Sequence, residues 1–267
     1  MTGIETIIIN TLLETLYAVG GLFAAGLLLS FMRREACQCY MAGFGYNAIL
    51  VTGWLGTPVH ELSHAAMCVL FGHQITEIKL FQKPDASGTM GYVNHRYNPM
   101  NPYQQIGNFF IGVAPLIGGT LAMMGLMRVF EGATMAQIVA VLEANWASSA
   151  SGVLTLTMVS QTFVTIWGLL FNAANFTSPL FYVFLFLCIC IASHMALSTA
   201  DVKGTVPGVV AILVLFLVLN IIFGNTAGVG TFLVRYNVLL ISFLTIAVVL
   251  SLINLMVSLV CYGVSRF

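Results

Sequence analysis

Long apolar stretches dominate the pattern of hydrophobic and polar positions along this chain, and polar residues gather in the short segments between them. A helix needs about 20 consecutive, mostly apolar residues to cross the hydrocarbon layer of a membrane. Six stretches meet this requirement. The pattern therefore predicts an all-α polytopic membrane protein with about six transmembrane helices, expected over residues 12–32, 43–71, 106–127, 179–197, 206–223 and 238–262.

Two segments depart from this helical pattern. Residues 75–81 alternate apolar and polar side chains, residues 83–88 have the composition of a turn, and residues 91–95 have the composition of a second short strand. We therefore expect a β-hairpin directly after the second span. Residues 131–172 are the other exception, because their first part is too polar to cross a membrane and their second part is rich in Thr, Ser and Gln.

Composition also indicates a membrane protein. Hydrophobic residues make up 59% of the 267 residues and charged residues 7%, which is more apolar surface than a soluble fold of this size can bury. The formal net charge is zero. With no basic run and no glycine-rich phosphate loop, the chain is not expected to bind nucleic acid. We predict a single domain over residues 1–267 embedded in the lipid bilayer.

The segment His60-Glu61-Leu62-Ser63-His64 lies inside the second predicted span. Two histidines four residues apart on a helix face the same side, so both imidazoles can bind one metal ion. The glutamate between them is placed to act as the general base of a metal-dependent hydrolase. Ionisable groups are costly at membrane depth and usually serve a function. A metal site is therefore favoured over a histidine pair satisfied by polar neighbours.

A catalytic zinc usually has three protein ligands and one open position, so the histidine pair needs a third ligand. Asp201 and His194 are the candidates. Seven residues of helix would separate them by about 10 Å, so only one of the two is expected to bind the metal directly. Asp201 is the expected ligand because its depth matches that of the histidine pair and its carboxylate lowers the positive charge of the site. His194 as the ligand is the open alternative; otherwise it is a supporting or substrate-facing group.

These residues resemble the site-2 protease family of intramembrane zinc metalloproteases. The resemblance rests on the His-Glu-x-x-His motif in a span, the short hairpin, the segment Gly112-Val-Ala-Pro-Leu-Ile-Gly-Gly119, and a late aspartate before a glycine. It covers residues 43–204 as a metalloprotease-like core, with residues 1–42 and 205–267 as accessory spans. The late segment Ser-Thr-Ala-Asp-Val-Lys-Gly departs from the Asn-Pro-x-x-Pro-like stretch that precedes the aspartate in the family.

The resemblance implies an intramembrane zinc metalloendopeptidase that hydrolyses a peptide bond of a membrane-protein substrate. His60, His64 and Asp201 would bind Zn²⁺, and Glu61 would activate a water molecule at the metal. The hairpin would hold an unwound segment of the substrate. The substrate-binding residues expected from this resemblance are Ile78, Leu80, Pro115 and His194.

The resemblance also implies a topology. The motif residues must share one side of the membrane, which would be the cytosolic side. For this to hold, residues 131–172 are expected to be interfacial or re-entrant. The charges of the loops do not choose a side, and the sequence does not determine the oligomeric state or the identity of the substrate.

Other classes of function stay open. The chain could be a zinc-binding membrane scaffold without protease activity, or a hydrolase that acts on lipid, because the same activated water could attack an ester. Metal transport is disfavoured because few ionisable groups lie elsewhere in the predicted spans. A rhomboid-like serine protease using Ser151 and His194 is disfavoured because Ser149 occupies the place of the first glycine in the Gly-x-Ser-Gly pattern of that family.

Overall fold

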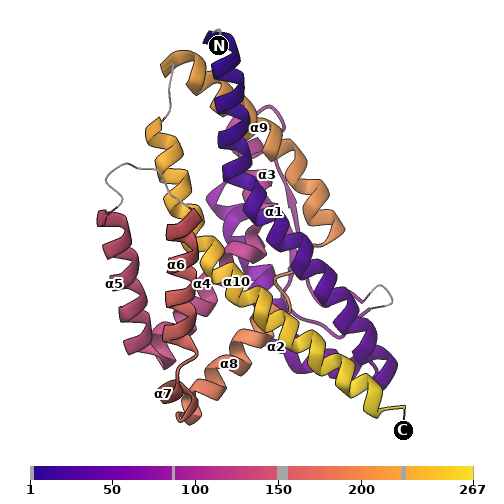
Figure 1. The fold of residues 1–267 in the computed structure, drawn as a ribbon. Helices are drawn as coiled ribbons and strands as arrows, with labels where there is room; N and C mark the ends of the chain where they lie inside the picture. Colours follow the sequence, from indigo (N-terminus) through magenta and orange to yellow (C-terminus); the bar gives the residue numbers. More distant parts are fainter. Residues whose placement is uncertain (1–2, 86–87, 149–155, 224–226, 267) are drawn as a thin grey trace.

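Most of the chain is helical, 81%, in the computed structural model, which describes residues 3–85, 88–148, 156–223 and 227–266. This part contains ten helices and one small two-stranded sheet (Figure 1). The elements are α1 (Gly3–Phe44), α2 (Tyr46–Leu70), β1 (Gln74–Lys79), β2 (Tyr92–Arg96), α3 (Pro102–Gly112), α4 (Ala114–Phe130), α5 (Gly132–Ser148), α6 (Leu156–Leu170), α7 (Ala173–Phe176), α8 (Pro179–Ala192), α9 (Thr199–Phe223) and α10 (Ala227–Val264).

Three of the described helices are long and apolar enough to cross a membrane: α1, α9, and residues Leu240–Val264 of α10. The pair α3 and α4, which is bent by 60°, makes a fourth if it counts as one span. Helix α8 is strongly apolar but has only 14 residues, fewer than the about 20 that a span needs. The described chain thus has three to four candidate spans, and the expected number of six stays a prediction.

The expected span at residues 179–197 differs from the structure. Helix α8 ends at Ala192, and residues 193–198 form a non-helical connection to α9. Ser30 of α1 holds this connection: its hydroxyl donates to the carbonyl oxygen of Leu197 and accepts from the Leu197 N–H, both at 2.9 Å. The backbone groups that a longer helix would use are therefore satisfied by tertiary contacts.

The segment 131–172 contains two helices, α5 and α6, that pack against each other (Figure 1). They have 17 and 15 residues, so each is shorter than a typical span. Ile138 and Ile166 are fully buried, so these helices join the main apolar core. Residues 149–155 between them lie outside the described part of the chain.

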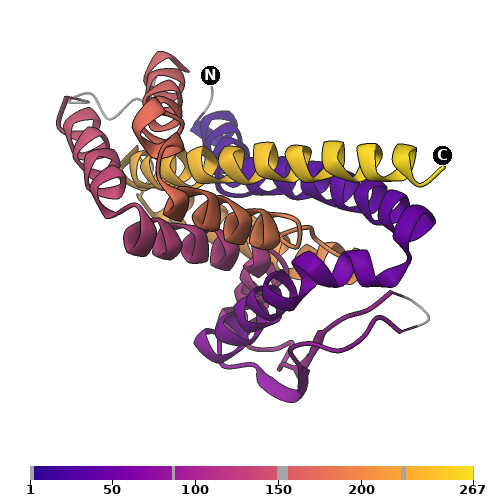
Figure 2. The same cartoon turned by 90° about the horizontal axis from the view of Figure 1, so that it is seen from below.

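The core lies between helices that are distant in sequence. Helix α1 packs along α10 (Figures 1 and 2) and also contacts α9, while α2 packs against α4 and α8. Helix α3 lies close against α9. A Cβ atom at Gly112 in α3 would lie 2.7 Å from the carbonyl oxygen of Asp201, so glycine permits this approach. The close approach places the last turn of α3 beside the first turn of α9.

The two strands pair antiparallel, with Ile78 opposite Val93 and Lys79 opposite Tyr92. A bulge at Thr76 interrupts the register, and the Thr76 hydroxyl donates to the carbonyl oxygen of Asn94 (3.1 Å). The alternating segments expected at 75–81 and 91–95 correspond to strands β1 and β2. The sheet follows α2 in the chain and lies at one edge of the helical body (Figure 2).

Candidate metal centre

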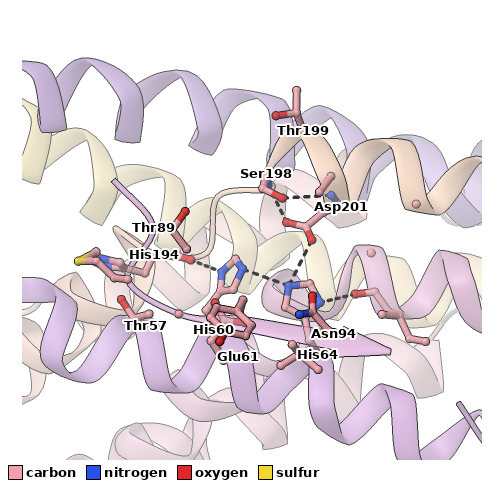
Figure 3. Close-up of a pocket in the computed structure, with 18 of the residues that line it drawn as sticks. Thr57, His60, Glu61, His64, Thr89, Asn94, His194, Ser198, Thr199 and Asp201 are labelled. Carbon is pink, nitrogen blue, oxygen red and sulfur yellow. Dashed lines mark hydrogen bonds and ion pairs between the residues drawn. The ribbon is translucent and has the colours of Figure 1, made fainter. Parts of the chain in front are cut away.

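His60 and His64 in α2 and Asp201 in the first turn of α9 form one cluster (Figure 3). One ligand atom from each residue lies within 4.8 Å of the others. The two Nε2 atoms of the histidines are 3.1 Å apart, and Nε2 of His64 is 3.4 Å from Oδ1 of Asp201. The structure therefore brings together the three residues that the sequence suggests as metal ligands.

A backbone carbonyl group orients the ring of His60. Its Nδ1 lies 2.7 Å from the carbonyl oxygen of His194. This carbonyl lies past the end of α8, and the N–H of Ser198 donates instead to Oδ2 of Asp201 (2.7 Å). The carbonyl is therefore not used in a helical bond to the N–H four residues ahead and is available to the histidine.

Pro115 makes a similar carbonyl available to His64. Nδ1 of His64 lies 2.8 Å from the carbonyl oxygen of Ile111. In a continuous helix this oxygen would accept from the N–H of residue 115, but proline has no N–H. The chain bends at this point, where α3 ends at Gly112 and α4 begins. Pro115 is buried and does not line the cavity. Its expected contact with substrate stays a prediction, while its missing N–H leaves the Ile111 carbonyl oxygen available to His64.

The arrangement of protons in this pair fits a metal ion. A carbonyl oxygen only accepts, so each Nδ1 must carry a proton, and each neutral ring then presents an unprotonated Nε2. Two acceptor atoms at 3.1 Å repel each other unless a cation lies between them. Two ligands on a tetrahedral zinc ion, each at about 2.0–2.1 Å, would be roughly 3.3 Å apart. The observed separations of 3.1 and 3.4 Å are close to this value.

Asp201 is held by the start of its helix. Its Oδ2 accepts from the N–H of Ser198, and its own N–H donates to Oγ of Ser198 at 3.1 Å. This reciprocal pair satisfies backbone groups at the helix start and leaves Oδ1 directed at His64. A fixed carboxylate of this kind can bind a metal with little loss of side-chain freedom.

The ring of His194 lies outside the cluster, although it lines the same cavity. Its Nδ1 lies 3.1 Å from the carbonyl oxygen of Cys190, and its Nε2 is buried with no hydrogen-bond partner. Only its backbone carbonyl reaches His60. The geometry therefore supports Asp201 over His194 as the third ligand.

Glu61 lines the cavity from α2 and is only 6% exposed. The chain leading into β2 crosses directly over it: a Cβ atom at Gly91 would lie 2.8 Å from Cγ of Glu61 and 2.9 Å from the carbonyl oxygen of Lys79. A side chain at position 91 would collide with this carboxylate or with strand β1. Because glycine has no side chain, the strand and Glu61 can border the same cavity.

The cavity has a volume of about 500 Å³. Residues 88–95 line it, and no residue of β1 does. The expected contacts of Ile78 and Leu80 with substrate are therefore not at this cavity, because β2 lies there and both side chains are exposed, at 44% and 37%. Sequence alternation locates a hairpin, but it does not reveal which of its strands borders the cavity.

Sequence reasoning missed several polar residues of the cavity, among them Thr57, Asn108 and Arg33. Among the described residues, four buried side-chain atoms have no hydrogen-bond partner, and three of them belong to cavity residues: Oγ1 of Thr57, Nδ2 of Asn108 and Nε2 of His194. Buried polar groups are usually hydrogen-bonded, so these atoms are available to a bound molecule. An isolated asparagine in the apolar run 106–112 was a usable signal.

A second histidine pair lies beside the sheet. Nδ1 of His73 is 3.0 Å from Nδ1 of His95, and Nε2 of His73 is 2.9 Å from the carbonyl oxygen of Gln104. Burial, together with the neighbouring His73 and His64, lowers the pKa of His95 below its usual value. His95 is also a lining residue of the cavity. Ser149 and Ser151, the residues of the serine-protease alternative, lie outside the described part of the chain.

Comparisons with known proteins found no match to a family model, to a curated protein or to a solved structure.

Proposed function

We propose that this chain is an intramembrane zinc metalloendopeptidase of the site-2 protease type. One observation carries the proposal: His60, His64 and Asp201 point toward one another beside the buried Glu61. Backbone carbonyl groups orient the two histidines, and hydrogen bonds with Ser198 hold the aspartate. Three protein ligands with one open position are typical of a catalytic zinc site, whereas structural zinc sites usually have four protein ligands.

Bound zinc supplies a Lewis acid that lowers the pKa of water and polarises a peptide carbonyl group. Glu61 accepts the proton from the attacking water and later delivers it to the leaving amine. Thr57, Asn108 and His194 offer hydrogen-bonding atoms that the protein itself does not use. They can hold the polar backbone of a substrate segment inside the cavity.

Strand β2 provides a surface for an extended substrate. Among the described residues it pairs only with β1, and its residues line the cavity. A transmembrane helix resists cleavage because its backbone groups are bonded internally. Strand addition at the edge of β2 would hold a locally unwound segment with its backbone beside Glu61.

The finer topology belongs to the same proposal. The protein would cross the membrane six times, with the hairpin after the second span, an interfacial or re-entrant segment at 131–172, and the cavity on the cytosolic side. Helices α2 and α8 are not among the three to four candidate spans. Six spans therefore require that such shorter or more polar helices also lie at membrane depth.

Replacing Glu61 tests the catalytic role. We expect Glu61→Gln to keep one zinc per chain and to lower the cleavage of a membrane-protein substrate by about 10²- to 10⁴-fold, the usual contribution of a general base. Zinc is measured by mass spectrometry and cleavage by gel assay in lipid nanodiscs. The control is Glu143→Gln, which removes an exposed carboxylate of α5 far from the metal ligands in sequence.

Each outcome of this experiment has a meaning. Unchanged cleavage in Glu61→Gln with full zinc would show that Glu61 is not the base. Hydrolysis of phospholipid esters instead of peptides, lost in Glu61→Gln, would replace the peptidase by a lipid hydrolase. Stoichiometric zinc with hydrolysis of neither substrate would leave a zinc-binding scaffold.

A further inference from the structure

Arg33 stands out because it is the only lysine or arginine among the described residues that line the cavity. It comes from α1, which the sequence placed in an accessory span outside the catalytic core. Its side chain is partly buried. A cationic side chain at this position faces the same space as the metal ligands and Glu61.

The face of α1 that carries Arg33 is fixed to the catalytic part of the chain. A Cβ atom at Gly26 would lie 2.6 Å from the side chain of Leu197, and the hydroxyl of Ser30 bonds to both backbone groups of Leu197. Residues 26, 30 and 33 lie on one face of a helix. Arg33 is thus held next to the connection that leads to Ser198 and Asp201.

Arg33 and its neighbour Arg34 differ in their partners. Arg34 bonds to Glu35 through two nitrogens, at 2.9 and 3.0 Å, and the side chain of Arg34 is 66% exposed. Within the described part of the chain, Arg33 forms no ion pair. A guanidinium group has five donors in a planar arrangement that matches a carboxylate. Arg33 therefore presents an unused binding group to the cavity.

The charge of the cavity favours an anionic ligand once the metal is bound. Its lining has one cationic residue, Arg33, and two carboxylates, Glu61 and Asp201. A bound dication would change the formal charge of the lining from minus one to plus one. In a site of low dielectric constant, this charge would attract a negatively charged group more strongly than in water.

We propose that Arg33 recognises a carboxylate of the substrate, so that the site prefers peptides with an acidic group close to the bond that is cleaved. This inference rests on the proposed peptidase function. The carboxylate can be an Asp or Glu side chain or a free C-terminus, since both offer the same pair of oxygens. A peptide is favoured over a lipid phosphate because Arg33 lines the cavity, whereas its neighbour Arg34 is exposed on the outer surface.

Peptide binding tests this role without relying on cleavage. The full chain, loaded with zinc and carrying Glu61→Gln to prevent turnover, is placed in nanodiscs of neutral lipid. Three fluorescent peptides of one sequence are compared by anisotropy: one with an acidic side chain and an amidated end, one with Gln in its place and an amidated end, and one with Gln and a free C-terminus. The added variants are Arg33→Gln, Arg33→Lys and Arg34→Gln.

We expect at least one carboxylate peptide to bind about tenfold more tightly than the neutral peptide, as one charge-assisted pair can provide. Arg33→Gln should remove this difference, Arg33→Lys should keep part of it, and Arg34→Gln should keep all of it. The peptide that shows the difference identifies the source of the carboxylate. Binding of the neutral peptide by Arg33→Gln demonstrates that the variant is folded.

Other outcomes overturn the proposal. Equal binding of all three peptides by the zinc-loaded protein would exclude a role for Arg33 in recognition while leaving the peptidase function intact. Binding of no peptide would contradict both. If Arg33→Gln left the peptide preference unchanged but reduced the retention of anionic phospholipid, Arg33 would be a lipid-binding residue.

Discussion

His60–His64 and His73–His95 are two histidine pairs with almost the same separation between ring nitrogens, 3.1 and 3.0 Å. In the first pair, both Nδ1 atoms lie against backbone carbonyls, so two unprotonated Nε2 atoms face each other. In the second pair, only Nε2 of His73 lies against a carbonyl. Nδ1 of His95 can therefore donate an ordinary hydrogen bond to Nδ1 of His73.

The difference shows that contact between two histidines does not by itself indicate a metal site. What matters is which ring nitrogens carry the protons, and the surrounding carbonyl groups decide this. One shared proton satisfies the second pair, and among the described residues no carboxylate completes a cluster there, whereas the first pair has two facing acceptor atoms with Asp201 beside them. Replacements at the first site should therefore lower the zinc content, and replacements in the second pair should leave it unchanged.

The largest expected effect is the loss of zinc when Asp201 is replaced. Asp201→Ala leaves two ligands and should lower the affinity for zinc by more than about 100-fold, beyond the 10- to 100-fold typical of residues that only support a ligand. Cleavage should disappear with the metal. His194→Ala should keep zinc, because only the backbone carbonyl of His194 contacts a ligand. Both variants are measured by competition with a zinc-binding dye.

His73→Ala provides the comparison with the second pair. It removes a buried histidine of similar surroundings (5% exposed) and should keep full zinc content. Zinc loss in His73→Ala comparable to that in Asp201→Ala would contradict the distinction between the pairs. An empty site in His194→Ala with zinc retained in Asp201→Ala would reverse the assignment of the third ligand.

A medium effect is expected from Pro115→Ala, which adds an N–H four residues after Ile111. This N–H can form a helical bond to the Ile111 carbonyl and so compete with His64. Loss of such a supporting partner typically costs 10- to 100-fold in metal affinity. Pro179→Ala is the matched control, because Pro179 also lies in the first turn of a helix but supports no histidine. Equal zinc affinity in the two variants would exclude the proposed role of Pro115.

The sequence was informative about local chemistry. The four-residue spacing placed His60 and His64 on one face of a helix, and alternation located the two strands of the sheet. The expectation of a mostly helical chain is confirmed, and three to four of its helices are candidate membrane spans. Asp201 was a candidate because it was expected near the end of a neighbouring helix, at the same membrane depth as the histidine pair.

The sequence could not predict tertiary relations. Hydropathy marked residues 12–32 as a span, but α1 continues to Phe44 because polar residues such as Arg33 and Glu35 are also good helix formers. The contribution of α1 to the cavity depends on its packing against a distant segment. Which strand of the hairpin borders the cavity likewise depends on how the sheet lies on α2, and Ile78 and Leu80 do not line the cavity.

The smallest expected effect concerns pH and the second pair. The usual pKa of histidine is about 6.5, and burial together with His73 and His64 lowers the pKa of His95 in the folded protein. Below pH 6.5, the unfolded chain binds a proton that the folded chain resists. The contribution of this pKa shift to the free energy of unfolding should therefore be fully present above this pH. It should be lost as the pH decreases from about 7.5 to 5.5. Because His95 is only partly buried, the change should be smaller than the about 1.4 kcal/mol that corresponds to one pKa unit.

This effect is measured by thermal unfolding of zinc-free protein in detergent at both pH values, for the wild type and for His95→Gln. Glutamine can still donate to Nδ1 of His73 but does not titrate, so the variant should lose less stability on acidification than the wild type. Removing zinc with a chelator in both samples separates this titration from acid-induced release of the metal by His60 and His64. An identical pH dependence in the two proteins would mean that His95 keeps its usual pKa, and the second pair would then contribute no pH-dependent stability.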